Sequence, residues 1–172
     1  YFVGVYLLDS SDKWAELKEA SGEAGKLLIK SRHRADVSGS NLVGLAIRDR
    51  AAKSYPHTTG EKYRANLPVL PYTRSELALP LIASDRVIGA LNLHSVRETD
   101  FGAEAINTLQ NMANQVAIAL ENAEVGDVAQ IRFRIEPVEL GGADQRVQGR
   151  GRVTAAIGPC EQVIFATEGD VA

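Results

Sequence analysis

The sequence has almost no cysteine and no excess of positive charge. Cys160 is the single cysteine among 172 residues, which excludes an internal disulfide and an all-cysteine metal site. This scarcity favours a reducing compartment, so we expect a cytoplasmic protein. The net charge of −3 argues against a nucleic-acid partner held by bulk charge. No apolar run approaches the roughly 20 residues that cross a bilayer, so we expect no membrane span in this segment.

Familiar catalytic motifs are missing as well. The sequence contains no Gly-x-Ser-x-Gly turn that would expose a nucleophilic serine. The stretch Gly149-Arg-Gly151 lacks the further glycines and the strand-to-helix context of a phosphate loop. His33, His57 and His94 are spaced too widely for a local metal motif. We therefore expect no metal site and no enzymatic activity.

The histidines have different expected roles. His94 lies two residues after Asn92, on the strand face opposite Leu91 and Leu93, where a structural or solvent-facing role is expected rather than a ligand-binding one. His57 lies in a proline-rich segment and is the better candidate for a pocket.

The composition that is present fits a folded domain. With 45% hydrophobic and 24% charged residues, the chain is close to globular averages. Its length suits one ordinary domain with a short appendage. Because the chain starts at Tyr1, inside an expected strand, we expect it to be part of a longer protein.

The first half of the chain predicts a hairpin and a short helix. Residues 1–9 and 14–20 are two strand-like runs joined by a polar turn, as in a β-hairpin. Residues 26–37 indicate a further strand only weakly, because one apolar run is followed by mostly polar residues. Residues 38–41 offer a helix N-cap before the helix expected over residues 42–52.

Residues 53–74 predict a loop, because prolines at positions 56, 68 and 71 forbid a long helix or a central strand. A loop of about twenty residues in a compact domain is often functional. It combines aromatic surface with guanidinium groups, which suits a small organic anion. The alternative is that its tyrosines cover the core and its arginines point to water. The candidate ligand-binding residues are Tyr55, His57, Tyr63, Arg64, Tyr72 and Arg74.

A second hairpin is predicted over residues 75–95. Leu77, Leu79 and Leu81 share one face of its first strand, and the matching face of the second carries residues 87, 89, 91 and 93. Pro80 removes a hydrogen-bond donor, which suggests a sheet edge or a bulge.

The strongest helix prediction covers residues 103–124. Its apolar positions are spaced alternately by three and four residues, the pattern of helices that pair with each other. We therefore expect a homodimer, with off-seam residues such as Met112 and Ile118 available to contact the sheet. The dimer positions are Ile106, Leu109, Ala113, Val116 and Leu120.

The sequence changes character after residue 125. Gly126 and Pro137 prevent the long helix from continuing. Residues 128–140, 152–157 and 162–167 are strand-like, so we expect residues 126–172 to form a β-rich extension or a linker to a following domain. The first of these strands is expected to pair with an exposed sheet edge, in its own chain or in a partner chain.

Several motifs occur in a familiar order. They are Arg74-Ser-Glu-Leu-Ala-Leu-Pro-Leu81, Val87-Ile-Gly-Ala-Leu-Asn-Leu93, Phe101, and a helix that ends in Glu121-Asn-Ala123, preceded by Leu42-Val-Gly-Leu-Ala46 and Asn66-Leu-Pro-Val-Leu-Pro71. Each motif alone is weak, but their order over residues 1–125 resembles a GAF domain, with the first helix of the family missing.

The resemblance implies an α+β fold of the GAF and PAS kind. Its antiparallel sheet has five or six strands, with helices on one face and a small-molecule pocket on the other, under residues 30–74. GAF domains are regulatory sensors in histidine kinases of two-component systems, phosphodiesterases, phytochromes and transcription activators. They commonly dimerise through their terminal helices and pass a signal to an output domain in the same chain.

Several GAF activities are disfavoured by what the matched region lacks. Free-methionine-sulfoxide reductases of this fold need several cysteines and phytochromes attach bilin through one, but residues 1–125 contain none. The cyclic-nucleotide pattern Asn-Lys-x-x-x-Phe-x-x-x-Asp-Glu is missing too. Haem would need an axial ligand, for which the three histidines are poor candidates. The sequence thus predicts a sensor of an unidentified small molecule; the alternatives are a structural dimerisation module without ligand and an enzyme of the GAF superfamily.

Overall fold

The computed structural model describes residues 2–56, 67–97, 101–124, 131–137, 151–157 and 161–166. The chain divides into two compact units, residues 1–121 and residues 122–172. Among the described residues, no helix is both long enough and apolar enough to span a membrane.

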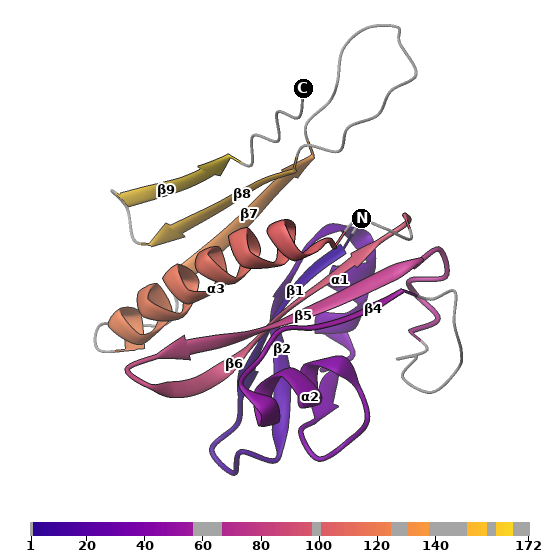
Figure 1. Ribbon diagram of the computed structural model, residues 1–172, viewed down its shortest axis with the longest axis horizontal. Helices are drawn as coiled ribbons and strands as arrows, with labels where there is room; N and C mark the ends of the chain where they lie inside the picture. The colour runs from indigo at the N-terminus through magenta and orange to yellow at the C-terminus, as the bar shows by residue number, and fades with distance from the viewer. Residues whose placement is uncertain are drawn as a thin grey trace, which may run out of the picture. The chain divides into compact units, whose positions relative to one another are not determined.

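The first unit is built on a six-stranded antiparallel sheet with the strand order β3-β2-β1-β6-β5-β4 (Figure 1). Both predicted hairpins are confirmed, and they place β1 beside β6 at the centre of the sheet. The strands are β1 (Phe2–Leu8), β2 (Trp14–Ala20), β3 (Arg34–Asp36), β4 (Lys53–Pro56), β5 (Ser75–Ala83) and β6 (Arg86–Ser95). The helices are α1 (Gly22–Lys30), α2 (Leu42–Asp49) and α3 (Ala103–Glu124).

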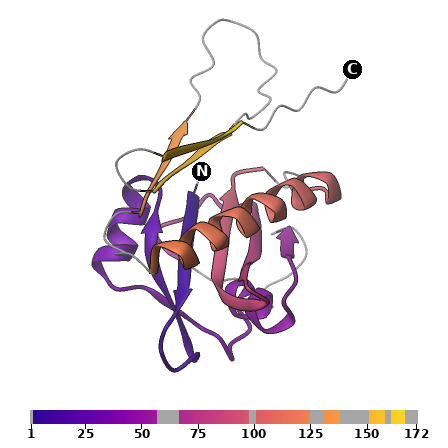
Figure 2. The same cartoon turned by 90° about the vertical axis from the view of Figure 1, so that its left-hand side faces the viewer.

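The two faces of the sheet are covered by different helices. Leu77 and Leu79 pair with Leu93 and Leu91, so their side chains share one face, as predicted. Helix α3 covers this face, which we call the α3 face (Figure 2). The opposite face carries α1 and α2 and is called the α1–α2 face. The expectation of helices on one face was therefore wrong, because the leucine face and its opposite both have apolar area to bury.

Two features hold β5 and β6 in place. Pro80 lies beyond the last residue of β5 that pairs with β4, and a bulge follows between Leu81 and Ile82, as its missing donor predicted. Gly89 on β6 permits a close approach of the backbones, because a Cβ there would lie 2.0 Å from the carbonyl oxygen of Tyr6.

Helix α3 buries one face and exposes the other. Gln110 Nε2 donates a hydrogen bond to the carbonyl oxygen of Pro80 at 3.0 Å, which fixes the helix over β5. Ile118 is 52% exposed on the opposite side of the helix, so its predicted sheet contact was wrong. The fully buried residues of α3 are Met112, Ala113, Val116, Ala117 and Leu120.

This burial changes the interpretation of the predicted dimer seam. Ala113, Val116 and Leu120 are buried within a single chain, and the other two seam residues are half-buried. A spacing of three and four residues is produced by any helix with one buried face, whether it packs on its own sheet or on a second copy. In this chain the seam is not an exposed surface.

The segment between the first hairpin and α2 contains a helix that the sequence pattern did not predict. Helix α1 has nine residues and buries Gly25 and Leu28, while Leu27 is exposed. Its consecutive apolar residues were interpreted as a strand because so short a helix shows little periodicity. The weak strand signal belongs to the three-residue β3.

The predicted helix after residue 41 is confirmed as α2, whereas the predicted loop over residues 53–74 contains the strand β4. Asn41 Oδ1 accepts a hydrogen bond from the Gly44 amide at 2.8 Å, which caps α2 at its N-terminus. The predicted loop over residues 53–74 begins with the edge strand β4, in which Tyr55 pairs with Glu76. Pro56 is tolerated there because it ends an edge strand.

The second unit is a three-stranded antiparallel sheet, with the order β7-β8-β9. Its strands are β7 (Ile131–Pro137), β8 (Gly151–Ile157) and β9 (Glu161–Ala166), close to the predicted runs. Strand β7 pairs with β8 along its whole length and not with an edge of the six-stranded sheet, which corrects that expectation. Gly126 and Cys160 lie outside the described residues.

Candidate functional site

A small cavity lies on the α1–α2 face of the sheet. Its volume is about 150 Å³. Its walls come from four strands of the sheet (β1, β3, β5 and β6), from the start of α2, and from residues in the connecting segments. The lining residues are Tyr6, His33, Arg34, Ala35, Asp36, Asn41, Val43, Leu67, Glu76 and Asn92.

Three buried polar side chains on β5 and β6 form a connected cluster. Glu76, Asn92 and His94 are only 2%, 1% and 3% exposed. Asn92 Nδ2 donates to Glu76 Oε1 at 2.9 Å, and His94 Nε2 lies 2.7 Å from Asn92 Oδ1. Because an amide oxygen only accepts, Nε2 carries the proton in this arrangement. We call these residues the Glu76–Asn92–His94 cluster.

His94 is held on its other side as well. Its Nδ1 lies 3.2 Å from Thr73 Oγ1, which is also 3.0 Å from the carbonyl oxygen of Leu70, so the single hydroxyl proton is positioned between two acceptors. The ring of Phe2 meets the imidazole edge-on, with 5.2 Å between centroids. His94 is therefore a structural residue of the core. Of the two roles expected for it, the structural one fits and the solvent-facing one does not.

Glu76 is a strongly perturbed acid in the wall of the cavity. Burial raises the pKa of its carboxyl group to about 7, although the hydrogen bond from Asn92 acts in the opposite direction. The His94 ring is 3.9 Å from Glu76 Oε1, so the two groups interact mainly through Asn92. Oε1 is thus engaged, while Oε2 accepts no hydrogen bond from the described residues.

Tyr6 lines the same cavity as this carboxyl group. Its side chain is 2% exposed, and its hydroxyl makes no hydrogen bond with the described residues. Burial and the negative charge of Glu76 raise the pKa of the Tyr6 phenol above its ordinary value, so it stays protonated at neutral pH. The cavity therefore offers an occupant one carboxyl oxygen and one phenol.

Two further polar residues that line the cavity, His33 and Asn41, already interact with neighbouring groups of the protein. His33 meets the Tyr6 ring edge-on at 6.0 Å, and desolvation lowers its pKa, which favours the neutral imidazole. Asn41 Nδ2 donates to the carbonyl oxygen of Asp36 at 2.7 Å while Oδ1 caps α2.

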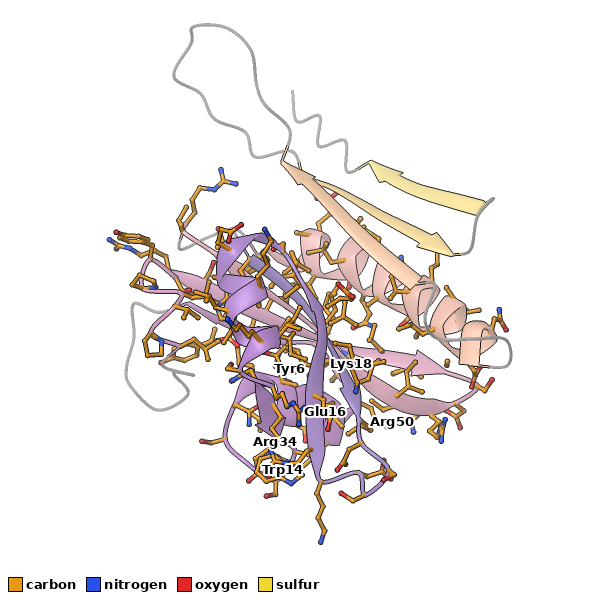
Figure 3. The ribbon with its side chains drawn as sticks, turned by 180° about the vertical axis from the view of Figure 1, so that it is seen from behind. Tyr6, Trp14, Glu16, Lys18, Arg34 and Arg50 are labelled. Carbon is orange, nitrogen blue, oxygen red and sulfur yellow. The ribbon has the colours of Figure 1, made fainter. Side chains whose placement is uncertain are left out.

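Arg34 lines the cavity, but its guanidinium group is stacked on Trp14. Ala35 is the buried residue of β3, so the side chain of Arg34 leaves from the other face of the strand. Its guanidinium lies 4.0 Å from the centre of the Trp14 ring (Figure 3). The guanidinium is thus engaged by the face of an aromatic ring.

The six predicted ligand-binding residues do not gather around this cavity. Tyr72 is 73% exposed, and Arg74 is exposed with its amide bonded to the Ser95 carbonyl at 2.7 Å. Tyr55 comes nearest: it faces the same side of the sheet as Glu76 and packs near α2 without lining the cavity. His57, Tyr63 and Arg64 lie outside the described residues.

The prediction missed Tyr6, Glu76 and Asn92. Glu76, Asn92 and His94 each stand next to a leucine in the sequence, and alternation of this kind normally marks a solvent-facing side. The available signal was that Glu76, Asn92 and His94 fall on one face of two neighbouring strands. No group of three or more metal-binding side chains occurs in the part of the chain that the structure describes.

Comparison with known proteins identifies relatives of the first unit. The family model for the GAF domain matches residues 2–121. The GAF domain of an Acinetobacter phosphoenolpyruvate-protein phosphotransferase superposes with a TM-score of 0.59 at 21% identity, over 74% of this chain and 75% of that one. The second GAF domain of DevS from Mycobacterium smegmatis gives a TM-score of 0.54 at 23% identity, over 72% and 82%.

An enzyme also occurs among the similar structures. A type II free methionine-R-sulfoxide reductase from Thermoplasma acidophilum is 25% identical, with a TM-score of 0.55 over 67% of this chain and 75% of that one. The comparison with curated proteins finds no match.

Proposed function

The chain belongs to the GAF domain family, and from this premise we propose that it is a regulatory module that binds a small molecule in the cavity on the α1–α2 face. Occupancy of the cavity would be passed to an output domain of a signalling protein. A ligand acts in this way only if its affinity differs between two conformations of the module.

The observation that carries this proposal is the pair of polar side chains that line the cavity. Burial raises the pKa of the Glu76 carboxyl group, and Asn92 engages only one of its two oxygens. Glu76 and Tyr6 both line the same space of about 150 Å³. A ligand that bonds to both side chains would offset the cost of burying them.

A chain of side chains supports a route from the cavity to α3. Asn41 lines the cavity and caps α2, and Arg50 follows the other end of that helix. Arg50 Nη2 donates to Asp85 Oδ1 at 2.7 Å, which ties α2 to the turn between β5 and β6. In the same turn Ser84 Oγ donates to Glu121 Oε2 of α3 at 2.6 Å. A shift of α2 on ligand binding would thus reach the helix on the opposite face.

An enzymatic role is the second candidate, because a reductase is among the similar structures. The reductases of this fold rely on several cysteines, and residues 2–121 contain none. We therefore favour a non-enzymatic module over a reductase.

Native mass spectrometry of protein purified without added ligand tests the proposal. We expect a small co-purified mass that is lost in Glu76→Gln and kept in the matched control Glu104→Gln, which removes an exposed carboxylate on α3. A structural dimerisation module is supported instead if no mass is found and no compound of a metabolite library raises the melting temperature.

A further inference from the structure

We infer that the occupant of the cavity is a small organic cation whose N–H groups donate to Glu76 Oε2 and to the Tyr6 hydroxyl oxygen. The inference rests on the proposed function, and it names the chemical class of the ligand. It differs from the small organic anion that the arginine-rich loop pattern suggested.

The arrangement of donors and acceptors favours a cation. Glu76 lines the cavity, and Asn92 occupies its Oε1, so Oε2 is the oxygen left to accept a hydrogen bond from an occupant. The Tyr6 oxygen offers a second acceptor on β1, which β6 separates from β5 in the sheet. An ammonium group has three N–H donors, and its hydrogen bonds to a carboxylate are about twice as strong as neutral ones.

The charges around Glu76 leave room for a positive ligand. Among the described residues, the basic group nearest to Glu76 in the cluster is His94, whose Nε2 bonds to Asn92. Lys53 of β4 lies on the same face, but its ammonium group is 2.5 Å from Asp49 Oδ2. The titratable and charged residues that face Glu76 or line its cavity are Tyr6, His33, Arg34, Asp36, Tyr55, Lys53 and His94.

The sign of the local potential follows from these positions. Desolvation lowers the pKa of His33, which favours its neutral form, and the guanidinium of Arg34 is stacked on Trp14. An anionic ligand would meet the Glu76 carboxylate without a described side-chain cation to offset it. A cation would stabilise the ionised carboxyl group, which burial otherwise disfavours.

The size of the cavity limits the ligand. An apolar cavity of about 150 Å³ holds a molecule the size of benzene. Val43, Ala35 and Leu67 supply apolar walls for a short carbon body. A primary amine with about five heavy atoms therefore matches both the volume and the polar end of the cavity.

Three probes of equal shape test the inference. Butylammonium, 1-butanol and butyrate would be titrated against the full chain, with binding followed by ligand-observed NMR. We expect butylammonium to bind with a Kd on the order of 1 mM at pH 8, at least about tenfold more tightly than the other two probes. Raising the pH from 6 to 8 should tighten its binding about tenfold, because Glu76 ionises over this range while the amine stays charged.

Matched variants separate the inference from the broader proposal. Glu76→Gln should lose butylammonium binding and its pH dependence, whereas Glu104→Gln should keep both, with folding checked by circular dichroism. If butanol or butyrate binds and butylammonium does not, the cation inference is wrong while a ligand-binding cavity stands. If butylammonium binds equally well to Glu76→Gln, the inference is also overturned. If no probe binds, it fails too, and the mass-spectrometry experiment then decides whether any ligand occupies the module.

Discussion

The two faces of the central sheet are built from the same strands but bury different kinds of side chain. On the α3 face, Leu77, Leu79 and Leu81 are fully buried under a helix. On the α1–α2 face, β5 carries the buried residue Glu76, and the neighbouring strand β6 carries the buried residues Asn92 and His94. One face is a dry core that holds the sheet together, and the other places buried polar groups around a cavity.

This difference teaches how strand alternation should be interpreted. Alternating leucine and polar residues usually indicate a sheet with one wet side. Here both sides are covered, so the polar side is an interior with hydrogen bonds of its own. A polar residue on a central strand that is covered on both sides is a candidate for binding because its desolvation has to be offset.

The largest effect is expected on the dry face. Leu79→Ala removes a fully buried side chain between α3 and the sheet and should lower the free energy of unfolding by about 3 kcal/mol. Urea denaturation measures the change. The matched control Leu27→Ala, on the exposed side of α1, should change it by no more than about 0.5 kcal/mol. Equal losses for both would contradict the burial difference.

A leucine on the polar face tests whether the two faces are interchangeable. Asn92→Leu adds apolar area but leaves Glu76 Oε1 and His94 Nε2 without their partner, so stability should fall by about 2 kcal/mol. Asn111→Leu on the exposed side of α3 provides the control, with little change expected in the same denaturation experiment. A more stable Asn92→Leu would show that the cluster is not needed for folding.

The buried carboxyl group of Glu76 should make the stability of the protein depend on pH, with an effect similar in size to that of Asn92→Leu. Because the folded-state pKa of Glu76 is about 7 and its ordinary value is 4.5, the folded protein binds more protons between these values. Stability should therefore decrease as the pH rises through this window, by about 2 kcal/mol between pH 5 and pH 8 for Glu76 alone. The difference between wild type and Glu76→Gln, measured by denaturation at each pH, isolates this contribution. A difference that does not vary with pH would contradict a raised pKa.

The smallest effect is expected where the two faces are joined. Arg50→Gln breaks an exposed ion pair with Asp85 and should change stability by about 0.5 kcal/mol or less. Its consequence should instead appear in hydrogen exchange, where a ligand-induced change in protection at the end of α3 is weakened. Lys18→Gln, which removes an exposed pair with Glu16 within β2, should leave the exchange response unchanged. An unaltered response in Arg50→Gln would exclude the turn as a route.

Much of the fold was predictable because it depends on local patterns. Both hairpins, α2 with its cap at Asn41, and the extent of α3 follow from alternation, capping residues and helical periodicity. Helix α1 and strand β4 were missed because short elements carry too few residues to show a period, and their form is decided by packing on the sheet.

The candidate site was less predictable for a related reason. The six candidates were chosen because Tyr and Arg cluster in one segment of sequence, whereas the cavity is formed by residues as distant as Tyr6 and Asn92. Only strand pairing brings them to the same face. Hydrogen-bond partners and burial, which give Glu76 its raised pKa, are properties of that arrangement.

The sequence by itself determined the family, the order of most elements and the absence of thiol chemistry from residues 2–121. Those conclusions rest on residue types and their spacing, which a linear chain displays directly. The tertiary structure alone decided that most of the seam of α3 is buried within its own chain. It also decided that Glu76, Asn92 and His94 are buried together. The physical reason is that periodicity shows which residues share a face, while only packing shows what covers that face.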